Sequence, residues 1–300
     1  MILKHTIKKE EQGRSLLYIL RGPMGLSAGM VRALKFYGGL FVDETLQFTN
    51  YKVTEGQVVT AHITHAQGVG DNIPEQGPLE VLWEDQGMLV VNKPPGMLVH
   101  PSRAKNSGTL ANYAAGYLEK ANERPVCHVV NRLDRDTSGV VVFAKNPYMK
   151  DGCSRALQMG EKRYKALAYG SLSPKAGEIN LPIKRKEEGN MYRIIHPDGK
   201  EAKTRYETEK VENYQGVSCS LLDIVLLTGR THQIRVHTLA VGSPLMGDCL
   251  YYTQASKTAS EHLGFHYQLL HCHQLSFIHP HTKEALCIKA PLPKDHLQWY

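Results

Sequence analysis

The apolar residues of this chain fall in short runs separated by glycine, proline and charged residues, a pattern typical of strands and turns. The clearest run, residues 140–144 (VVVFA), is rich in β-branched side chains and is bounded by Gly139 and by Asn146-Pro147. It predicts a buried strand. Further strands are predicted at residues 79–85 and 88–91, at 162–170, where charged and apolar residues alternate, and at 221–227.

Two stretches predict helices. Residues 26–34 form a short amphipathic segment in which Ser27 is the expected N-cap, and Gly38 lies where a left-handed residue would end the helix. The second helix follows the strand at 221–227. Thr231 is its expected N-cap, and it should end near Gly242.

The order of these elements predicts an α+β chain with two domains. Residues 1–64 combine the first helix with a short strand at 40–42, a turn at Asp43-Glu44 and a strand at 58–63. Residues 65–78 are polar, carry several glycines and prolines and show no periodicity, which predicts a linker. Residues 79–300 then form the larger domain.

Composition narrows the class of protein. A chain of 300 residues with 42% hydrophobic content can bury one sizeable core and still form a small second domain. Lysine and arginine total 36 against 29 acidic residues, so the net charge of +7 favours a polyanionic partner. The six cysteines form no Cys-x-x-Cys pair, which indicates neither a zinc ribbon nor a redox motif and fits a reducing compartment.

Targeting, cofactor and metal signals are missing from the sequence. Residues 1–14 lack the apolar core of a secretory signal, and no segment has the apolar length of a membrane span, so we expect a cytoplasmic protein. No dinucleotide or P-loop motif occurs, and we expect no cofactor. His271-Cys272-His273 suggests a metal site, but consecutive residues of an extended segment cannot all face one ion. We expect structural packing there and no metal.

The most informative stretch is residues 131–139 (NRLDRDTSG), which crowds charge into a turn before the buried strand. If this segment is extended, Arg132 and Asp134 lie on one face, and the guanidinium would favour the ionised carboxylate that a nucleophile or a base needs. A surface turn in which Asp136, Thr137 and Ser138 satisfy local backbone donors is an equally open interpretation.

Basic residues recur at positions suited to phosphate. His232 and Arg235 lie three apart on the second predicted helix, whose start beside a strand end could bind phosphate or fix a carboxylate. Arg32 and Lys35 share one face of the first helix in the same way. Residues 184–186 (KRK) could also track phosphates, although such runs are usually solvated surface.

Several of these motifs resemble one family. Arg132-Leu133-Asp134 followed by Thr137-Ser138-Gly139 resembles the signature loop of the RluA-type pseudouridine synthases, which isomerise uridine to pseudouridine in RNA. The resemblance covers about residues 79–293 and includes residues 92–96 (NKPPG), 162–166 (KRYKA) and 229–237 (GRTHQIRVH). It departs at Asn131, where the family usually has histidine. Residues 1–64 resemble, more weakly, the α-L type RNA-binding domain, with Asp43-Glu44 in place of its usual hairpin Asn-Gly.

The resemblance implies a pseudouridine synthase fold, with a mixed, mainly antiparallel sheet, flanking helices and a central cleft. It implies that Asp134 is catalytic, that Arg235 pairs with it, and that Tyr164 lies against the uracil, although composition alone would make Tyr164 a core residue. Arg132 would fill the gap left by a flipped base. The expected RNA-binding residues are Arg32, Lys35 and Arg230. Ribosomal RNA is favoured as the partner over transfer RNA, by family analogy only, and a monomer is the simplest expectation.

Two other functions stay open. A non-catalytic RNA-binding protein of ribosome assembly would fit the basic balance and the N-terminal domain, although it has no need of an acidic Asp134 in a basic cleft. A hydrolase acting on a nucleoside or sugar would use a second carboxylate, which Asp136 could supply, and it would release free uracil.

Overall fold

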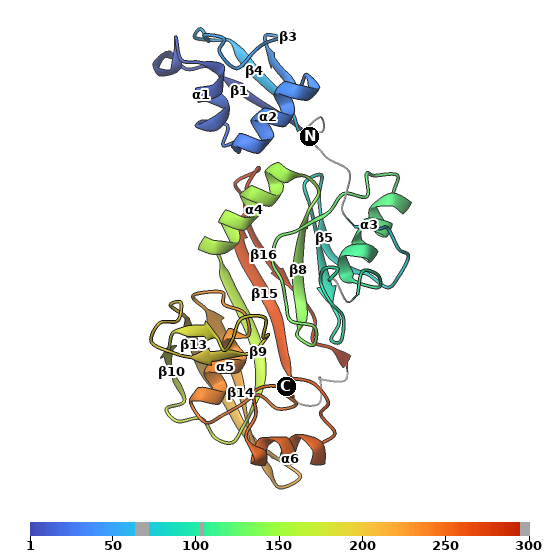
Figure 1. Ribbon diagram of the computed structural model, residues 1–300, viewed down its shortest axis with the longest axis vertical. Coiled ribbons are helices and arrows are strands. Elements are labelled where there is room, and N and C mark those ends of the chain that lie inside the picture. Colours follow the sequence, from blue (N-terminus) through green and yellow to red (C-terminus); the bar gives the residue numbers. More distant parts are fainter. Residues whose placement is uncertain (64–71, 103–104, 295–300) are drawn as a thin grey trace.

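The computed structural model describes residues 1–63, 72–102 and 105–294. Figure 1 shows a small N-terminal unit at one end of the molecule and a long sheet below it. The N-terminal unit is an antiparallel four-stranded sheet in the order β1-β4-β2-β3. Its elements are β1 (Ile2–Thr6), a 3-10 helix (Lys9–Glu11), α1 (Leu16–Arg21), α2 (Ala28–Tyr37), β2 (Leu40–Val42), β3 (Thr45–Leu46) and β4 (Val58–His62). The two helices bury their apolar faces in a core of their own with this sheet.

The predicted helix and hairpin of this unit are confirmed. The Ser27 hydroxyl accepts from the backbone N–H of Met30, and Gly38 ends α2 in the left-handed conformation with φ 71°. Asp43 and Glu44 both have positive φ, as a two-residue hairpin turn requires. The Asp43 carboxylate accepts from the backbone N–H of Val58 at 2.8 Å, so the acid in this turn anchors the start of β4.

The larger sheet has ten strands. Its main path runs β10-β13-β14-β9-β15-β8-β6-β5, with β16 beside β15 and β7 beside β8. The strands are β5 (Glu80–Glu84), β6 (Met88–Lys93), β7 (His128–Val129), β8 (Ser138–Ala144), β9 (Glu161–Tyr169), β10 (Ala176–Asn180), β13 (Lys203–Tyr214), β14 (Val217–Leu226), β15 (Leu270–Ile278) and β16 (Ala285–Lys289). Among these pairings only β8 with β15 is parallel. The predicted α+β class with a mixed, mainly antiparallel sheet is confirmed.

The remaining elements flank this sheet. They are α3 (Leu110–Lys120), α4 (Pro147–Met159), α5 (Gln233–Ala240), α6 (Gln254–His262) and a separate hairpin of β11 (Ile183–Arg185) and β12 (Arg193–Ile195). Helix α4 packs against β8 and β15, and β8 is buried along its whole length, as its β-branched composition predicts. None of the helices in the described part of the chain has both the length and the apolarity that a membrane span needs.

The parallel pair β8–β15 depends on one glycine. Gly139 has φ 114°, and a Cβ atom built there would lie 2.2 Å from the carbonyl oxygen of Cys272 on β15. No other residue could occupy this position without moving one strand. The sequence therefore brings β15 directly against the first residues of β8, where the charged loop of residues 131–137 ends.

The predicted linker is partly packed. Residues 64–71 lie outside the described residues, but Asn72 donates from its side chain to the carbonyl of Cys127 at 3.0 Å. The backbone N–H of Glu75 donates to the carbonyl of Asn112 on α3 at 3.1 Å. The last part of the predicted linker thus belongs structurally to the large domain.

Candidate active site

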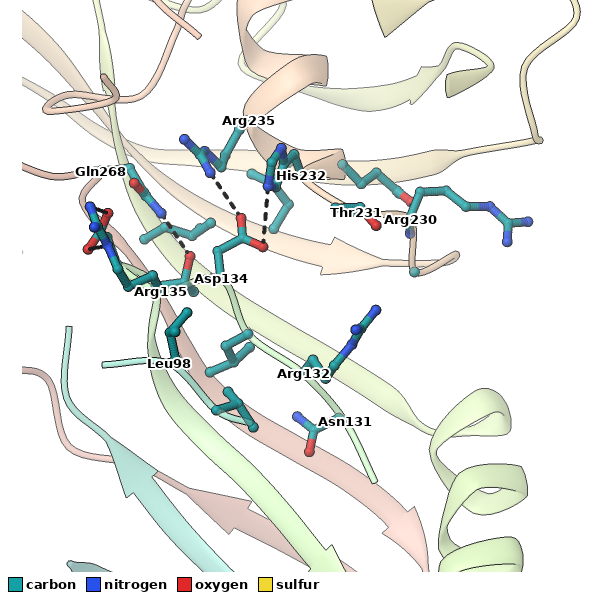
Figure 2. Close-up of a pocket in the computed structure, with 18 of the residues that line it drawn as sticks. Leu98, Asn131, Arg132, Asp134, Arg135, Arg230, Thr231, His232, Arg235 and Gln268 are labelled. Atoms are coloured by element: carbon teal, nitrogen blue, oxygen red, sulfur yellow. Dashed lines mark hydrogen bonds and ion pairs between the residues drawn. The ribbon is translucent and has the colours of Figure 1, made fainter. Parts of the chain in front are cut away.

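A cleft of about 900 Å³ opens over the middle of the large sheet. Its lining comes from segments far apart in the sequence: residues 131–137 before β8, Tyr164 of β9, residues 229–235 at the start of α5, and residues 268–270 before and in β15. Figure 2 shows Asp134 from the first of these segments facing His232 and Arg235 at the start of α5. The order of strands in the sheet therefore places these residues together, because strands that are neighbours in the sheet carry loops that are distant along the chain.

The loop of residues 131–137 is fixed at both ends. Asn131, the departure from the family pattern, accepts from the backbone N–H of Val142 at 2.8 Å and donates to the carbonyl of Val140 at 3.0 Å. Near the other end, the buried Lys93 ammonium donates to the carbonyl of Arg135 at 2.7 Å. Asp134 lies between these anchors, so its backbone is held while its side chain faces the cleft.

Asp134 is paired with a buried arginine. The Arg235 guanidinium donates from Nη1 to Oδ2 of Asp134 at 3.1 Å, and from Nε and Nη2 to the two oxygens of Asp248, both at 2.7 Å. Burial opposes the charge of Arg235, but the hydrogen bonds and charge of Asp248, followed by those of Asp134, outweigh it and raise the arginine pKa. Arg235 is therefore a permanent cation beside a carboxylate that remains partly open to the cleft.

Arg132 does not hold Asp134. The condition for that pairing, an extended segment, is not met, because residues 131–137 form a loop with a turn, and the guanidinium bound to Asp134 comes from α5. In Figure 2 the Arg132 guanidinium lies apart from the Asp134 carboxylate. Arg132 is exposed and lines the cleft.

Tyr164 lies on β9, is 93% buried and contributes to the cleft wall. Burial, with smaller contributions from Cys272 and the charge of Asp134, raises the pKa of its hydroxyl well above the ordinary value. Its ring is therefore a neutral aromatic surface beside the catalytic carboxylate candidate. Tyr164 is thus both a core residue and a cleft residue.

The start of α5 differs from the expectation. Thr231 is not the N-cap; His232 holds that position, with φ 57° and no side-chain capping bond. Next to it, the Gln233 side-chain oxygen accepts from the hydroxyl of Thr228 and from the backbone N–H of Arg230. These bonds close the turn that leads into the helix.

A basic hollow adjoins the cleft. This hollow is a second space of about 430 Å³, and Arg230 lines both it and the cleft. Four other cations line the hollow alone: Lys184, Arg185, Arg193 and Lys200. Arg32 and Lys35 line neither, because they lie on α2 of the N-terminal unit. The structure thus brings together five of the seven predicted site residues.

Asp248 and Tyr251 were not recognised from the sequence as parts of the site. Asp248 has a fully buried side chain, and in the sequence it is a lone carboxylate within the otherwise apolar residues 244–251. Gly247-Asp248 also belongs to the family's order of motifs, but that motif alone assigned it no role. Throughout residues 1–63, 72–102 and 105–294, no group of three histidine, cysteine, aspartate or glutamate side chains could hold a metal ion. His271 instead bonds the Ser138 hydroxyl at 2.8 Å, joining β15 to β8.

Known proteins are similar to this chain in sequence and in fold. The family described as RNA pseudouridylate synthase matches residues 87–240. The uncharacterized RNA pseudouridine synthase YjbO of Bacillus subtilis is 34% identical over 282 residues, covering 91% of this chain and 94% of its own. Ribosomal large subunit pseudouridine synthase D of Nitrosomonas europaea is 33% identical over 258 residues, covering 85% of this chain and 74% of its own.

A solved structure agrees with these relatives. Human RNA Pseudouridylate Synthase Domain Containing 1 superposes with a TM-score of 0.60 at 25% identity, covering 73% of this chain and 86% of that one. Residues 87–240, which match the family, include the charged loop, the buried strand after it and α5. The resemblance to the RluA-type enzymes is confirmed, and the chain belongs to the RNA pseudouridine synthases, a family of isomerases.

Proposed function

We propose that this enzyme converts specific uridines of large-subunit ribosomal RNA to pseudouridine, as a cytoplasmic monomer, with Asp134 as its catalytic residue. The observation that carries this proposal is the Asp134 carboxylate, which is open to a basic cleft and bound to a buried, permanently charged Arg235. Relatives named ribosomal large subunit pseudouridine synthase D favour ribosomal over transfer RNA.

The reaction breaks a nitrogen–carbon glycosidic bond and forms a carbon–carbon bond after the uracil rotates. No electron is gained or lost. The target nucleotide must leave its stack to reach Asp134, which acts on it as nucleophile or base while Arg235 stabilises the anion. Tyr164 offers its ring to the uracil, and the exposed Arg132 fills the gap in the RNA.

Arg230 contacts the RNA backbone in this proposal. Its Nε donates to the carbonyl of Glu201 at 2.9 Å, which holds the side chain between the cleft and the basic hollow. A strand leaving the cleft would meet Arg230 first and then Lys184, Arg185 and Lys200 on the walls of the hollow. Phosphate binding there would release counterions.

The N-terminal unit supplies a second RNA contact through Arg32 and Lys35, which are exposed on α2. Two aromatic residues support this proposal: Phe36 is 81% exposed at the end of α2, and Phe48 is 70% exposed after β3. Bases stack on such exposed rings, and cations beside them attract the backbone. Since Asp43 is used within its hairpin, its charge is partly satisfied by Val58 and Gln57.

The rival functions fit the site less well. A pure RNA-binding protein gains nothing from an open carboxylate held by a buried arginine. A hydrolase would need Asp136 as its second acid, but both oxygens of Asp136 accept from the Arg135 guanidinium, at 2.9 and 3.0 Å. Both oxygens are thus occupied by a neighbouring side chain, and in the part of the chain that the structure describes no hydrogen bond joins Asp136 to Asp134.

The decisive experiment is a site-resolved pseudouridine map of total RNA from cells lacking this gene, complemented by wild type or by Asp134→Asn. We expect one or a few sites to disappear and to return only with wild type, because the amide cannot act as base or nucleophile. The purified variant should keep nearly full RNA affinity, since no phosphate contact is removed.

The matched control is Asp151→Asn on α4, which removes a carboxylate outside both the cleft and the hollow. It should restore every site. Restoration by Asp134→Asn would refute the catalytic assignment, and release of free uracil by the purified enzyme would establish the hydrolase.

A further inference from the structure

His232 is an unusual residue at the edge of the site. It enters α5 with φ 57°, a left-handed conformation that costs a non-glycine residue free energy and that clusters at functional sites. Its side chain is only 10% exposed, and each ring nitrogen faces a different partner. Nδ1 lies 2.8 Å from the Tyr251 hydroxyl, and Nε2 lies 3.8 Å from Oδ1 of Asp134. Figure 2 shows the ring directed at the Asp134 carboxylate.

The partners of Tyr251 favour one arrangement of the protons. Its hydroxyl oxygen already accepts from the backbone N–H of Arg193 at 2.8 Å, which favours its own proton pointing at Nδ1 of His232. In that arrangement Nδ1 accepts and carries no proton, so a neutral imidazole carries its proton on Nε2. The nitrogen that faces Asp134 would then be the donor.

Tyr251 is itself held by the ion pair at the centre of the site. Oδ1 of Asp248, which accepts from Arg235, also accepts from the backbone N–H of Tyr251 at 3.0 Å. The Arg235 guanidinium lies over the Tyr251 ring, 5.1 Å from its centre. The group that sets the histidine proton is thus tied to the arginine that binds Asp134.

We propose that Tyr251 locks His232 as the Nε2–H tautomer, and that this N–H donates to Oδ1 of Asp134 while Arg235 holds Oδ2. Both carboxylate oxygens are then fixed from α5, and the carboxylate plane is set before substrate arrives. The 3.8 Å separation shortens to a hydrogen bond in the substrate complex. His232 and Tyr251 are positioning residues, and the proposal rests on the proposed catalytic role of Asp134.

The charges around His232 favour its neutral form. Burial lowers its pKa, Asp134 raises it, Arg235 on α5 and Arg193 on β12 lower it, and Asp248 raises it. The net direction is downward, so the ring is neutral at pH 7. At acid pH a second proton would go to Nδ1 and displace the Tyr251 donor. The imidazolium would then weaken Asp134 as a base or nucleophile, so activity should fall on the acid side.

Histidine side-chain ¹⁵N NMR of the purified enzyme tests the tautomer directly. We expect the proton of His232 on Nε2 in wild type and in Asp134→Asn, because Tyr251 sets it. In Tyr251→Phe the lock is lost, so a mixture of tautomers and a raised His232 pKa should appear. Tyr192→Phe removes a hydroxyl from a neighbouring ring, 6.2 Å from Tyr251 between ring centres, and should leave the His232 signals unchanged.

Steady-state kinetics then distinguish a positioning role of Tyr251 and His232 from a purely structural one. Tyr251→Phe should lower kcat by about three- to tenfold with KM unchanged, the effect of one lost hydrogen bond. His232→Gln can still reach Asp134 with a donor N–H and should keep most of kcat, with the acid limb of its pH profile moved to lower pH. His232→Asn tolerates the left-handed backbone but is too short to reach, so it should lose kcat as Tyr251→Phe does.

A proton found on Nδ1 of wild-type His232 would overturn the proposal, as would His232→Asn with wild-type kcat and pH profile. Full activity of Asp134→Asn would instead refute the catalytic role of Asp134, while the NMR result could still establish the tautomer. The two failures are therefore distinguishable.

Discussion

At the scale of single residues, the site is organised around one shared guanidinium. Arg235 binds Asp248, which is fully buried, and Asp134, whose side chain is 26% exposed. The buried carboxylate fixes the arginine with two bonds, from Nε and Nη2, and Nη1 donates to the open carboxylate. One carboxylate thus has a structural task, while the other is available for chemistry.

Asp248→Asn should separate these tasks. Loss of the buried charge leaves Arg235 with one partly exposed anion, so we expect the free energy of unfolding to fall by about 3 kcal/mol. The carboxylate of Asp134 would also be drawn toward the freed guanidinium, and kcat should fall. Chemical denaturation and single-turnover kinetics measure the two effects.

A suitable comparison is Glu178→Gln, which breaks an exposed pair with Arg205 at 3.5 Å. It should change stability by less than about 1 kcal/mol and leave kcat unaltered. Equal stability of Asp248→Asn and this control would show that the buried pair contributes little.

Sequence motifs identified Asp134 and Arg235 but not the arrangement around them. Asp134 and Arg235 are 101 positions apart, and only the family resemblance paired them. Asp248 and Tyr251 lie in a segment without regular structure, where periodicity carries no information. The pairing of Arg132 with Asp134 depended on an extended backbone, whereas this loop is held by hydrogen bonds with β8 and Lys93.

At the scale of elements, local pattern predicted helix α2 and the strands β2, β4, β5, β6, β8, β9 and β14 to within a few residues, but not the other strands, among them β13 and β15. The run at 140–144 lies in β8, and the alternating run at 162–170 coincides with β9 except at its ends. Local pattern could not predict that β15 lies between β8 and β9, because strand pairing depends on contacts far apart in sequence. The cleft follows from that pairing, so its shape was accessible only through the family resemblance.

The β11–β12 hairpin gives a prediction at this scale. Replacing Lys184, Arg185 and Lys200 with alanine should weaken RNA binding and reduce the salt slope of log affinity by about two to three. The reason is that these cations line the hollow beside the cleft. Binding titrations across a range of salt concentrations measure the slope, and kcat at saturating RNA should change little.

Alanine at Lys120, Lys150 and Lys289 provides the matched control, because these exposed lysines lie on α3, α4 and β16 outside the hollow. The same charge is removed from other surfaces. If both triple variants lose the same affinity, the hollow has no special role and only net charge matters.

At the scale of the whole molecule, the two larger sheets have separate cores, and we propose that their units have separate tasks, RNA binding and catalysis. Deleting residues 1–64 should weaken RNA affinity by about tenfold or more at low salt, because Arg32, Lys35 and the exposed rings are lost together. Turnover at saturating RNA should stay within about twofold. Equilibrium binding and steady-state kinetics on the same transcript separate the two quantities.

The N-terminal unit contacts the large domain, so the deletion can also affect the stability of that domain. The Asn146 side chain approaches the sulfur of Met1 at 3.6 Å, and Tyr148 packs on the small core. Thermal unfolding of the shortened chain should therefore show a single transition with a slightly lower melting temperature. Unchanged RNA affinity would make the N-terminal unit a bystander in binding.

The position of β15 also sets when the enzyme becomes competent during its own synthesis. Asp134 precedes β8, while Arg235 follows β14, and these two parts of the sheet meet through β15, residues 270–278. A ribosome makes residues 134 and 235 well before that strand. The nascent chain thus carries both charged partners without the framework that joins them, and catalysis begins only after residue 278 has emerged and inserted.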